Sequence, residues 1–343
     1  QAIFLLRSAP LTVLHPWSCG IGCAPKAMGG SKSKVVPPNK YVVHAAAGGF
    51  HTVLCFQDGS VKAAGYSIWG QSIVPDFEGK KVVKVAGGGQ HTLCLFEDGT
   101  ARGFGNDMYK QSTIPDTEGE RIIQLEAGES HSLMILENGV AKCFGLNKQG
   151  QVAVPDLQGK KVVHGACGNK HTILVLEDGT AIGFGQNDHG QRTVPDLQGK
   201  KVAQAAAGGR HSILVFEDGT ARGFGNNEYG QRTFPKLGGK RILQAVGGDY
   251  HTVLVLDDGT VKVCGDKRVG QTTLPDLSDK KVVHCACGDY HTILVCHDGT
   301  VKAFGYNGSA QIDLDECFGI KPKQPRFNFD FSRFTQCSCL QGQ

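Results

Sequence analysis

Residues 208–231 read GGRHSILVFEDGTARGFGNNEYGQ, and close variants of this stretch return along the chain at a fixed step of 40 residues. Every copy carries a histidine at the same place. The seven histidines are His51, His91, His131, His171, His211, His251 and His291. A constant period of this size is typical of repeat architectures, in which each unit buries its apolar face only against its neighbours. The sequence therefore predicts seven stacked copies of one supersecondary unit.

The second copy shows what one unit contains. Short runs rich in β-branched and other apolar residues, at 80–86, 91–96 and 100–105, are separated by glycine-rich breaks and are predicted to be strands. Asp98-Gly99 between two of these runs indicates a hairpin turn, in which both residues are expected at positive φ. Residues 111–115 are expected to add a short outer strand, because Pro115 suits a sheet edge. No stretch has helical periodicity over the length that a helix needs.

Three or four antiparallel strands per 40 residues, repeated seven times, predict an all-β fold: a seven-bladed β-propeller built from seven 40-residue repeats. An open β-solenoid is the alternative, but solenoids have shorter coils and little hairpin chemistry. The propeller is expected over residues 40–320, after an N-terminal extension (1–39) and before a C-terminal tail (321–343). Residues 35–40 and 317–325 are candidates for latching the first blade to the last.

The unit quoted above resembles the regulator-of-chromosome-condensation repeat, and the resemblance recurs in every copy. The compact unit, with Gln-x-Thr-x-Pro after the loop, is closest in style to bacterial short repeats, which include a β-lactamase-inhibitory propeller. The resemblance implies a seven-bladed propeller. It also implies a choice of functions: nucleotide exchange on a small GTPase, chromatin docking, UV-B sensing, or substrate recognition in a ubiquitin-ligase system. The fold therefore does not fix the function.

Departures from the family pattern remove some of these functions. Members that catalyse nucleotide exchange carry a wedge inserted in one blade, whereas all seven repeats here keep the 40-residue step. The UV-B receptor uses clustered tryptophans beside the repeat histidine, whereas this chain has only Trp17 and Trp69. We expect no ligase catalytic domain after the repeats.

Composition adds limits of its own. A formal net charge of +4 differs from the concentrated basic stripe of nucleic-acid-binding proteins, so no nucleic-acid partner is expected. The thirteen cysteines occupy no single repeat position and are interpreted as reduced thiols that pack as small apolar residues. Cys285-x-Cys287 and Cys337-x-Cys339 lack the paired spacing of a zinc site. We expect no metal and no cofactor.

Seven internal copies separate structural from functional positions. A residue that is present in every copy is required by blade geometry, and the seven histidines are of this kind. Each is expected to donate or accept a hydrogen bond at a neighbouring strand. The glutamines that close the units are expected to brace loops. They are Gln71, Gln111, Gln151, Gln191, Gln231, Gln271 and Gln311.

Positions that vary between copies are candidates for binding. Strand direction places the loop before each histidine and the loop before each glutamine on one face, and here the copies disagree. Aromatic and arginine side chains dominate interface hot spots. Loops that drift without constraint are the alternative interpretation. The candidate partner-binding residues, an aromatic and a basic arc with three loop residues, are Phe50, Trp69, Tyr109, Lys170, Arg210, Tyr229, Tyr250 and Tyr290.

These features predict a non-catalytic protein–protein interaction module that presents one variable face to a protein partner. No P-loop, GxSxG, HExxH or dinucleotide-binding motif is present, so we do not expect an enzyme. Two alternatives stay open. One is a regulator of a small GTPase or a substrate-recognition propeller of a ubiquitin-ligase system. The other is a structural subunit of a larger assembly. The propeller is expected to be a cytoplasmic monomer.

The start of the chain carries one further motif. Met28 is followed by Gly29 and by Ser33, which fits the N-myristoylation pattern M-G-x-x-x-[ST], and Lys32 and Lys34 would favour anionic lipid. Lipidation at Gly29 would give the protein peripheral membrane contact. The alternatives are a chance match inside a linker, or residues 1–27 as a targeting remnant or a translation upstream of the true start.

Overall fold

The structure, a computed structural model, describes residues 41–278 and 280–314, and the regular structure there is a set of short β-strands. They form seven antiparallel sheets of three consecutive strands each. The predicted extension (1–39), the predicted tail (321–343), Gly29 and the two candidate latch segments lie outside the described residues. Among the residues that are described, no helix is long and apolar enough to span a membrane.

Each sheet has a first, a middle and a third strand. The first strands are β1 (Val42–Ala47), β4 (Val82–Gly87), β7 (Ile122–Ala127), β10 (Val162–Cys167), β13 (Val202–Ala207), β16 (Ile242–Gly247) and β19 (Val282–Cys287). The middle strands are β2 (His51–Phe56), β5 (His91–Phe96), β8 (His131–Leu136), β11 (His171–Leu176), β14 (His211–Phe216), β17 (His251–Leu256) and β20 (His291–Cys296). The third strands are β3 (Val61–Gly65), β6 (Ala101–Gly105), β9 (Ala141–Gly145), β12 (Ala181–Gly185), β15 (Ala221–Gly225), β18 (Val261–Gly265) and β21 (Val301–Gly305).

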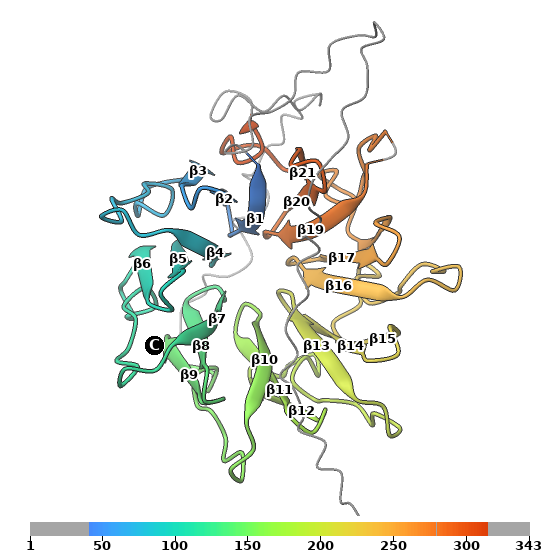
Figure 1. Cartoon of the computed structure of the whole chain (residues 1–343). Helices are drawn as coiled ribbons and strands as arrows, with labels where there is room; N and C mark the ends of the chain where they lie inside the picture. Colours follow the sequence, from blue (N-terminus) through green and yellow to red (C-terminus); the bar gives the residue numbers. More distant parts are fainter. Residues whose placement is uncertain (1–40, 279, 315–343) are drawn as a thin grey trace, which may run out of the picture. The chain divides into compact units, whose positions relative to one another are not determined.

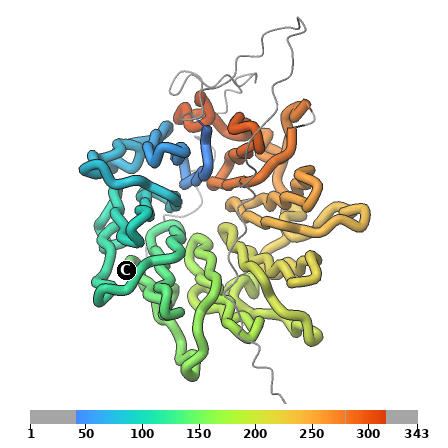
Figure 2. The backbone as a smooth tube through the Cα atoms, in the orientation of Figure 1, coloured from blue at the N-terminus to red at the C-terminus, as the bar shows by residue number. Residues whose placement is uncertain are grey.

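The seven sheets follow one another around a ring (Figure 1). Each first strand contacts the first strand of the next sheet, and β19 of the last sheet contacts β1 of the first. The same closed path is visible in the backbone trace (Figure 2). The prediction of a seven-bladed β-propeller is therefore confirmed, and the open solenoid is excluded. Blades are numbered from blade 1 (β1–β3) to blade 7 (β19–β21).

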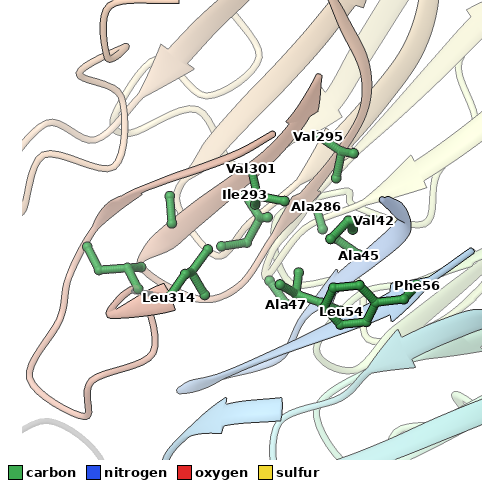
Figure 3. Close-up of a cluster of buried hydrophobic side chains, with 12 residues drawn as sticks. Val42, Ala45, Ala47, Leu54, Phe56, Ala286, Ile293, Val295, Val301 and Leu314 are labelled. Atoms are coloured by element: carbon green, nitrogen blue, oxygen red, sulfur yellow. The ribbon is translucent and has the colours of Figure 1, made fainter. Parts of the chain in front are cut away.

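The apolar core lies between neighbouring blades. Every residue of a middle strand such as β11 is buried, because blades cover both of its faces, and this explains the uninterrupted apolar run after each histidine. At the junction of the two ends, Leu54 and Phe56 of blade 1 share one buried cluster with Ile293 and Val295 of blade 7 (Figure 3). Similar clusters fill the other six boundaries. Burial thus closes the ring.

A ring of hydrogen bonds, which we call the histidine clamp, also joins each blade to the next. The clamp consists of the seven repeat histidines and the Thr or Ser that follows each of them. His51 Nε2 lies 2.8 Å from Thr92 Oγ1 of the next blade, and His291 Nε2 closes the ring 3.1 Å from Thr52 Oγ1. The other five pairs lie at 2.8–3.0 Å. This arrangement explains why the histidine is present in every copy.

The hydroxyl partner determines which imidazole nitrogen carries the proton. Thr92 Oγ1 donates its single proton to the carbonyl oxygen of Gln71, at 2.8 Å, so it can only accept from His51. His51 is therefore the Nε2–H tautomer, and its Nδ1 bears a lone pair that meets no hydrogen-bonding partner among the described residues. The ring lies against Gly48, where a Cβ would be 2.2 Å from the imidazole Cε1. Glycine three residues before the histidine is thus a steric requirement.

We expect His171→Ala to lower the free energy of unfolding by about 1–3 kcal/mol, because the Ser212 hydroxyl loses its buried donor. Urea unfolding followed by circular dichroism measures this loss. His297→Ala is the control, because His297 is exposed and its change should cost almost nothing. A stoichiometric zinc ion that is lost on His171→Ala, with unchanged stability, would contradict the structural role.

The free edge of each first strand is capped by a side chain of the preceding blade. Gln204 Oε1 accepts from the main-chain N–H of Ala245 at 3.1 Å, and Gln244 Oε1 accepts from Cys285 N–H at 3.0 Å. An uncapped strand edge would offer unpaired main-chain groups to other chains. The varied residues at this repeat position therefore protect the inner strands.

Two local predictions were wrong in the same copy. The 96–100 hairpin forms, but only Gly99 has positive φ, because Asp98 uses its carboxylate to accept from Thr100 N–H at 2.9 Å. Residues 111–113 form a bend and residues 114–115 are irregular, so this segment contains no outer strand. The reason is that Asp107 Oδ1 accepts the N–H groups of Ser112 and Thr113, both at 3.0 Å, so these donors are not available for a ladder.

Candidate protein-binding face

Strand direction gives the propeller two different faces. One, the hairpin face, carries the hairpin turns such as 57–60. The other, the variable face, carries the loops before the histidines (48–50 and equivalents) and before the glutamines (66–70 and equivalents). The two loops of a blade are joined by a main-chain hydrogen bond, from Tyr66 N–H to Phe50 O at 2.8 Å in blade 1. Gln71 braces the second loop by accepting from Trp69 N–H at 3.1 Å.

On the hairpin face, the lysine before a first strand pairs with the aspartate in the hairpin turn of the same blade. Lys200 Nζ lies 2.9 Å from Asp218 Oδ2, and Lys160 lies 2.8 Å from Asp178. Such pairs are solvent-accessible and recur from blade to blade, and each contributes about 0.2–1 kcal/mol. The pairing leaves this face little charge with which to select a partner.

Four predicted site residues come together on the variable face and form part of an aromatic row. The ring centroids of Tyr229 and Tyr250 lie 5.3 Å apart, those of Tyr250 and Tyr290 5.8 Å, and those of Tyr290 and Phe50 6.2 Å. The row continues to Tyr306, 6.0 Å from Phe50. It therefore runs over blades 5, 6, 7 and 1.

The sequence did not reveal two members of this region. Tyr306 comes from the second loop of blade 7, and its approach to Phe50 of blade 1 depends on ring closure. Arg268 lies over the Tyr229 ring at 4.6 Å and is held by Asp266, whose Oδ2 is 2.9 Å from Arg268 Nε. A guanidinium over an aromatic face is a favourable cation–π contact. Comparison of the sequence copies does not show that residues of a second loop contact the neighbouring blade, so both residues were missed.

Acidic residues at the inner end of the first loops form a second feature that the sequence analysis missed. Asp249 and Asp289 directly precede Tyr250 and Tyr290. Asp249 Oδ1 accepts from Asn169 Nδ2 at 2.7 Å, across the blade that carries only glycine, Gly209, at this position. Burial raises the pKa of both carboxyl groups. The charge of Glu129 also raises the pKa of Asp249, and the charges of Asp249 and Glu129 also raise the pKa of Asp289. The row is therefore bordered by carboxyl groups whose ionised form a nearby cation would stabilise.

The two predicted basic residues, Lys170 and Arg210, lie beside this acidic group. Lys170 Nζ is 3.7 Å from Glu129 Oε2, and Arg210 Nη1 donates to His189 Nε2 at 3.4 Å. The positive charges of both residues stabilise the ionised form of Asp249 and lower its pKa. The basic arc is therefore partly neutralised by carboxylates and is not a separate positive surface.

Trp69 and Tyr109 occupy a different part of the same face, at the second loops of blades 1 and 2. Trp69 is 44% exposed and Tyr109 is 39% exposed. Three further exposed apolar residues, Ile68, Ile73 and Met108, stand beside them in sequence. They were missed because an isolated apolar residue in a loop gives no periodic signal. Within the described residues, no group of three or more histidine, cysteine or acidic side chains is arranged to hold a metal ion.

Comparisons with known proteins agree with this architecture. A family model described as "Regulator of chromosome condensation (RCC1) repeat" matches residues 82–111, 122–151, 162–191, 202–231 and 242–271. No curated protein matches the chain detectably in sequence. The matched segments start at the first strand and end at the glutamine of blades 2 to 6.

Solved structures show the same fold at low sequence identity. Human WBSCR16 matches with a TM-score of 0.65 and 19% identity, over 75% of this chain and 86% of that one. Yeast RCC1 (Prp20), in its complex with Kap60, matches with a TM-score of 0.63 and 16% identity, over 87% and 88%. The ectodomain of the Arabidopsis thaliana receptor kinase ACR4 gives 0.63 and 17%, over 79% and 97%. The matched repeats therefore show that blades 2 to 6 are regulator of chromosome condensation (RCC1) repeats, and the solved structures show the same propeller fold.

Proposed function

We propose that the chain is a non-catalytic protein-interaction module that binds a protein partner through its variable face. The aromatic row carries this proposal. Tyr229, Tyr250, Tyr290 and Phe50 are brought into one row from four blades, at repeat positions where some copies hold side chains that are not aromatic, such as Ser130 and Val269. Blade geometry does not require these aromatic residues, and such side chains dominate protein interfaces.

Related propellers support a protein partner in general. The solved structures of Prp20 concern its complex with Kap60 and its binding to Gsp1p and histones. The second candidate function, regulation of a small GTPase, is favoured by the RCC1 repeats in blades 2 to 6. Against it stands the regular 40-residue step of the described blades, which leaves none of them an inserted wedge.

Replacing Phe50, Tyr250 and Tyr290 together by alanine should weaken partner binding, with each true hot spot contributing about 2 kcal/mol or more. The partner is first isolated by affinity purification with the full chain, and its affinity is then measured for the wild type and the triple variant. Thermal melts confirm that the variant is folded. A GTPase partner that binds best without nucleotide would favour the second candidate.

Charge reversal on the hairpin face is the matched control. Lys200→Glu with Lys201→Glu changes two residues far along the strands from the aromatic row and should leave the affinity unchanged. If that pair abolishes binding while the aromatic triple leaves it intact, the hairpin face is the binding surface.

A further inference from the structure

We propose that exposed apolar side chains on blades 1 and 2 form a docking ridge for an amphipathic helix that carries acidic residues beside its apolar stripe. This inference rests on the proposed function, because it names the chemistry of the partner for one part of the variable face. The ridge consists of Ile68, Trp69, Ile73, Met108 and Tyr109.

The exposure of these side chains is the first argument. Ile68 is 74% exposed, Ile73 67% and Met108 64%. Arg268 and Tyr229, which hold the repeat positions of Met108 and Trp69 on another pair of adjacent blades, lie 4.6 Å apart, so we expect the loops of blades 1 and 2 to adjoin. Apolar side chains at such exposure contribute little to fold stability, and adjoining exposed apolar residues mark interaction sites. The exposed apolar side chains of the ridge therefore lower solubility and add little to the stability of the blades.

Comparison between blades gives the second argument. Ile68 and Met108 hold the same repeat position, and so do Trp69 and Tyr109. In the other five blades the first of these positions carries Lys148, Asp188, Glu228, Arg268 or Gly308. A large apolar side chain is thus not needed at the first position to form this loop, and among the seven blades only blades 1 and 2 combine a large apolar side chain there with an aromatic one at the second position.

The main chain of the ridge indicates what kind of segment can bind. Trp69 N–H is bonded to Gln71 Oε1, and Tyr109 N–H to Gln111 Oε1 at 2.8 Å. The N–H of Ile73 is bonded to Gly70 O at 3.0 Å. These loops therefore offer no free strand edge for an added β-strand. A helix satisfies its own main chain and docks through side chains alone, so it fits this surface.

Charge around the ridge indicates the flanking residues of the partner. The side chain of Lys110 is 77% exposed, and its Nζ lies 3.6 Å from Asp107 Oδ2. The carboxylate of Asp107 also accepts four hydrogen bonds from Ser112 and Thr113 in its own loop. Lys148 on the next blade makes no ion pair with any described residue. These two lysines and one aspartate leave a net positive charge, so acidic residues on the helix would be attracted.

Trp69 supplies a direct readout. The chain has two tryptophans, so Trp17→Phe leaves Trp69 as the single emitter. The probe is a synthetic helical peptide of about 16 residues, with leucine and phenylalanine in an i, i+3, i+4, i+7 stripe and glutamate on both sides. Titration should shift Trp69 emission to the blue. A scrambled peptide of the same composition should give no shift, and a peptide with lysine in place of glutamate should bind at least tenfold more weakly.

Variants locate the binding site. Ile68→Lys and Met108→Lys should each weaken the acidic peptide at least tenfold. Glu228→Lys is the matched control, because it places lysine at the same repeat position on blade 5, and it should leave binding unchanged. Equal binding of the lysine peptide, unchanged binding to both ridge variants, or no blue shift with any peptide would overturn the inference. A Trp69 shift with anionic lipid vesicles in place of the peptide would also overturn it, by assigning the ridge to a membrane.

The two proposals can fail separately. If the ridge variants bind the peptide like the wild type while the aromatic triple loses the native partner, only the docking ridge is wrong. If the peptide binds the ridge and the aromatic triple keeps the native partner, the partner-binding surface is the ridge and not the aromatic row.

Discussion

Acidification from about pH 7.5 to about pH 5 should destabilise the propeller by on the order of 10 kcal/mol, because the histidine clamp is held neutral in the folded state. Burial lowers the pKa of the seven clamp histidines from 6.5 to about 3 or about 4. Urea unfolding by circular dichroism, repeated across this pH range, measures the effect. A free energy of unfolding that stays constant between pH 7 and pH 5.5 would contradict it.

The sign follows from proton binding in the two states. The unfolded chain titrates its histidines near pH 6.5, whereas the folded chain keeps them neutral down to the lower folded pKa values. Stability is therefore complete above pH 6.5 and falls as the pH decreases below it. At pH 5.5 the seven unfolded histidines hold about six protons, which corresponds to a slope of about 8 kcal/mol per pH unit.

Other buried groups act in both directions. Burial raises the pKa of Glu126 to about 7 and also raises the pKa of Asp249 and Asp289. Ionisation of these three groups destabilises the fold as the pH rises, which opposes the effect of the histidines. Burial lowers the pKa of His44 and His284, which reinforces it. The clamp histidines outnumber the acids, and the net effect is loss of stability on acidification.

One clamp residue can be removed to test the origin of the slope. His171→Gln should reduce the proton uptake on unfolding by about one. A slope for His171→Gln equal to that of the wild type would assign the pH dependence to groups outside the clamp.

The propeller could be predicted because one structural demand is repeated. Each His must meet the Thr or Ser of the next blade, and each Gly must accept the imidazole ring, so the 40-residue period records the ring directly. The outer strand could not be predicted in the same way. Strand propensity and Pro115 favoured it, but the Asp107 carboxylate accepts hydrogen bonds from the main-chain N–H groups. The hydrogen-bond partner of a single side chain produces no periodic pattern in the sequence.

The candidate site was predictable only where variation falls at one repeat position. Tyr250, Tyr290 and Phe50 share such a position, so comparison of the copies found them and ring closure joins them. Tyr306 stands at another position and reaches the row from a different loop. The pKa of Asp289 depends on burial and on nearby charges, which spacing in the sequence does not report.

Phe304→Ala should produce the largest loss of stability expected from a single truncation, about 3–5 kcal/mol, because it opens a cavity at a closed blade boundary. Phe304 is fully buried in a cluster with Val253 and Val255 of blade 6 and Leu294 of blade 7. A loss of this size should lower the melting temperature by about 6–10 °C in a domain of this length. Differential scanning calorimetry measures both quantities.

Internal copies supply the control for this substitution. Phe104 holds the same repeat position in blade 2 but is only partly buried, so Phe104→Ala should cost clearly less than Phe304→Ala. Blades 1 and 6 carry Ala64 and Cys264 at this repeat position. A small side chain is therefore compatible with the blade fold when the surrounding residues fill the space. The cost at Phe304 must then come from the unfilled volume rather than from the blade geometry. Equal losses at Phe104 and Phe304 would contradict this, since burial at the two sites differs while the repeat position is the same.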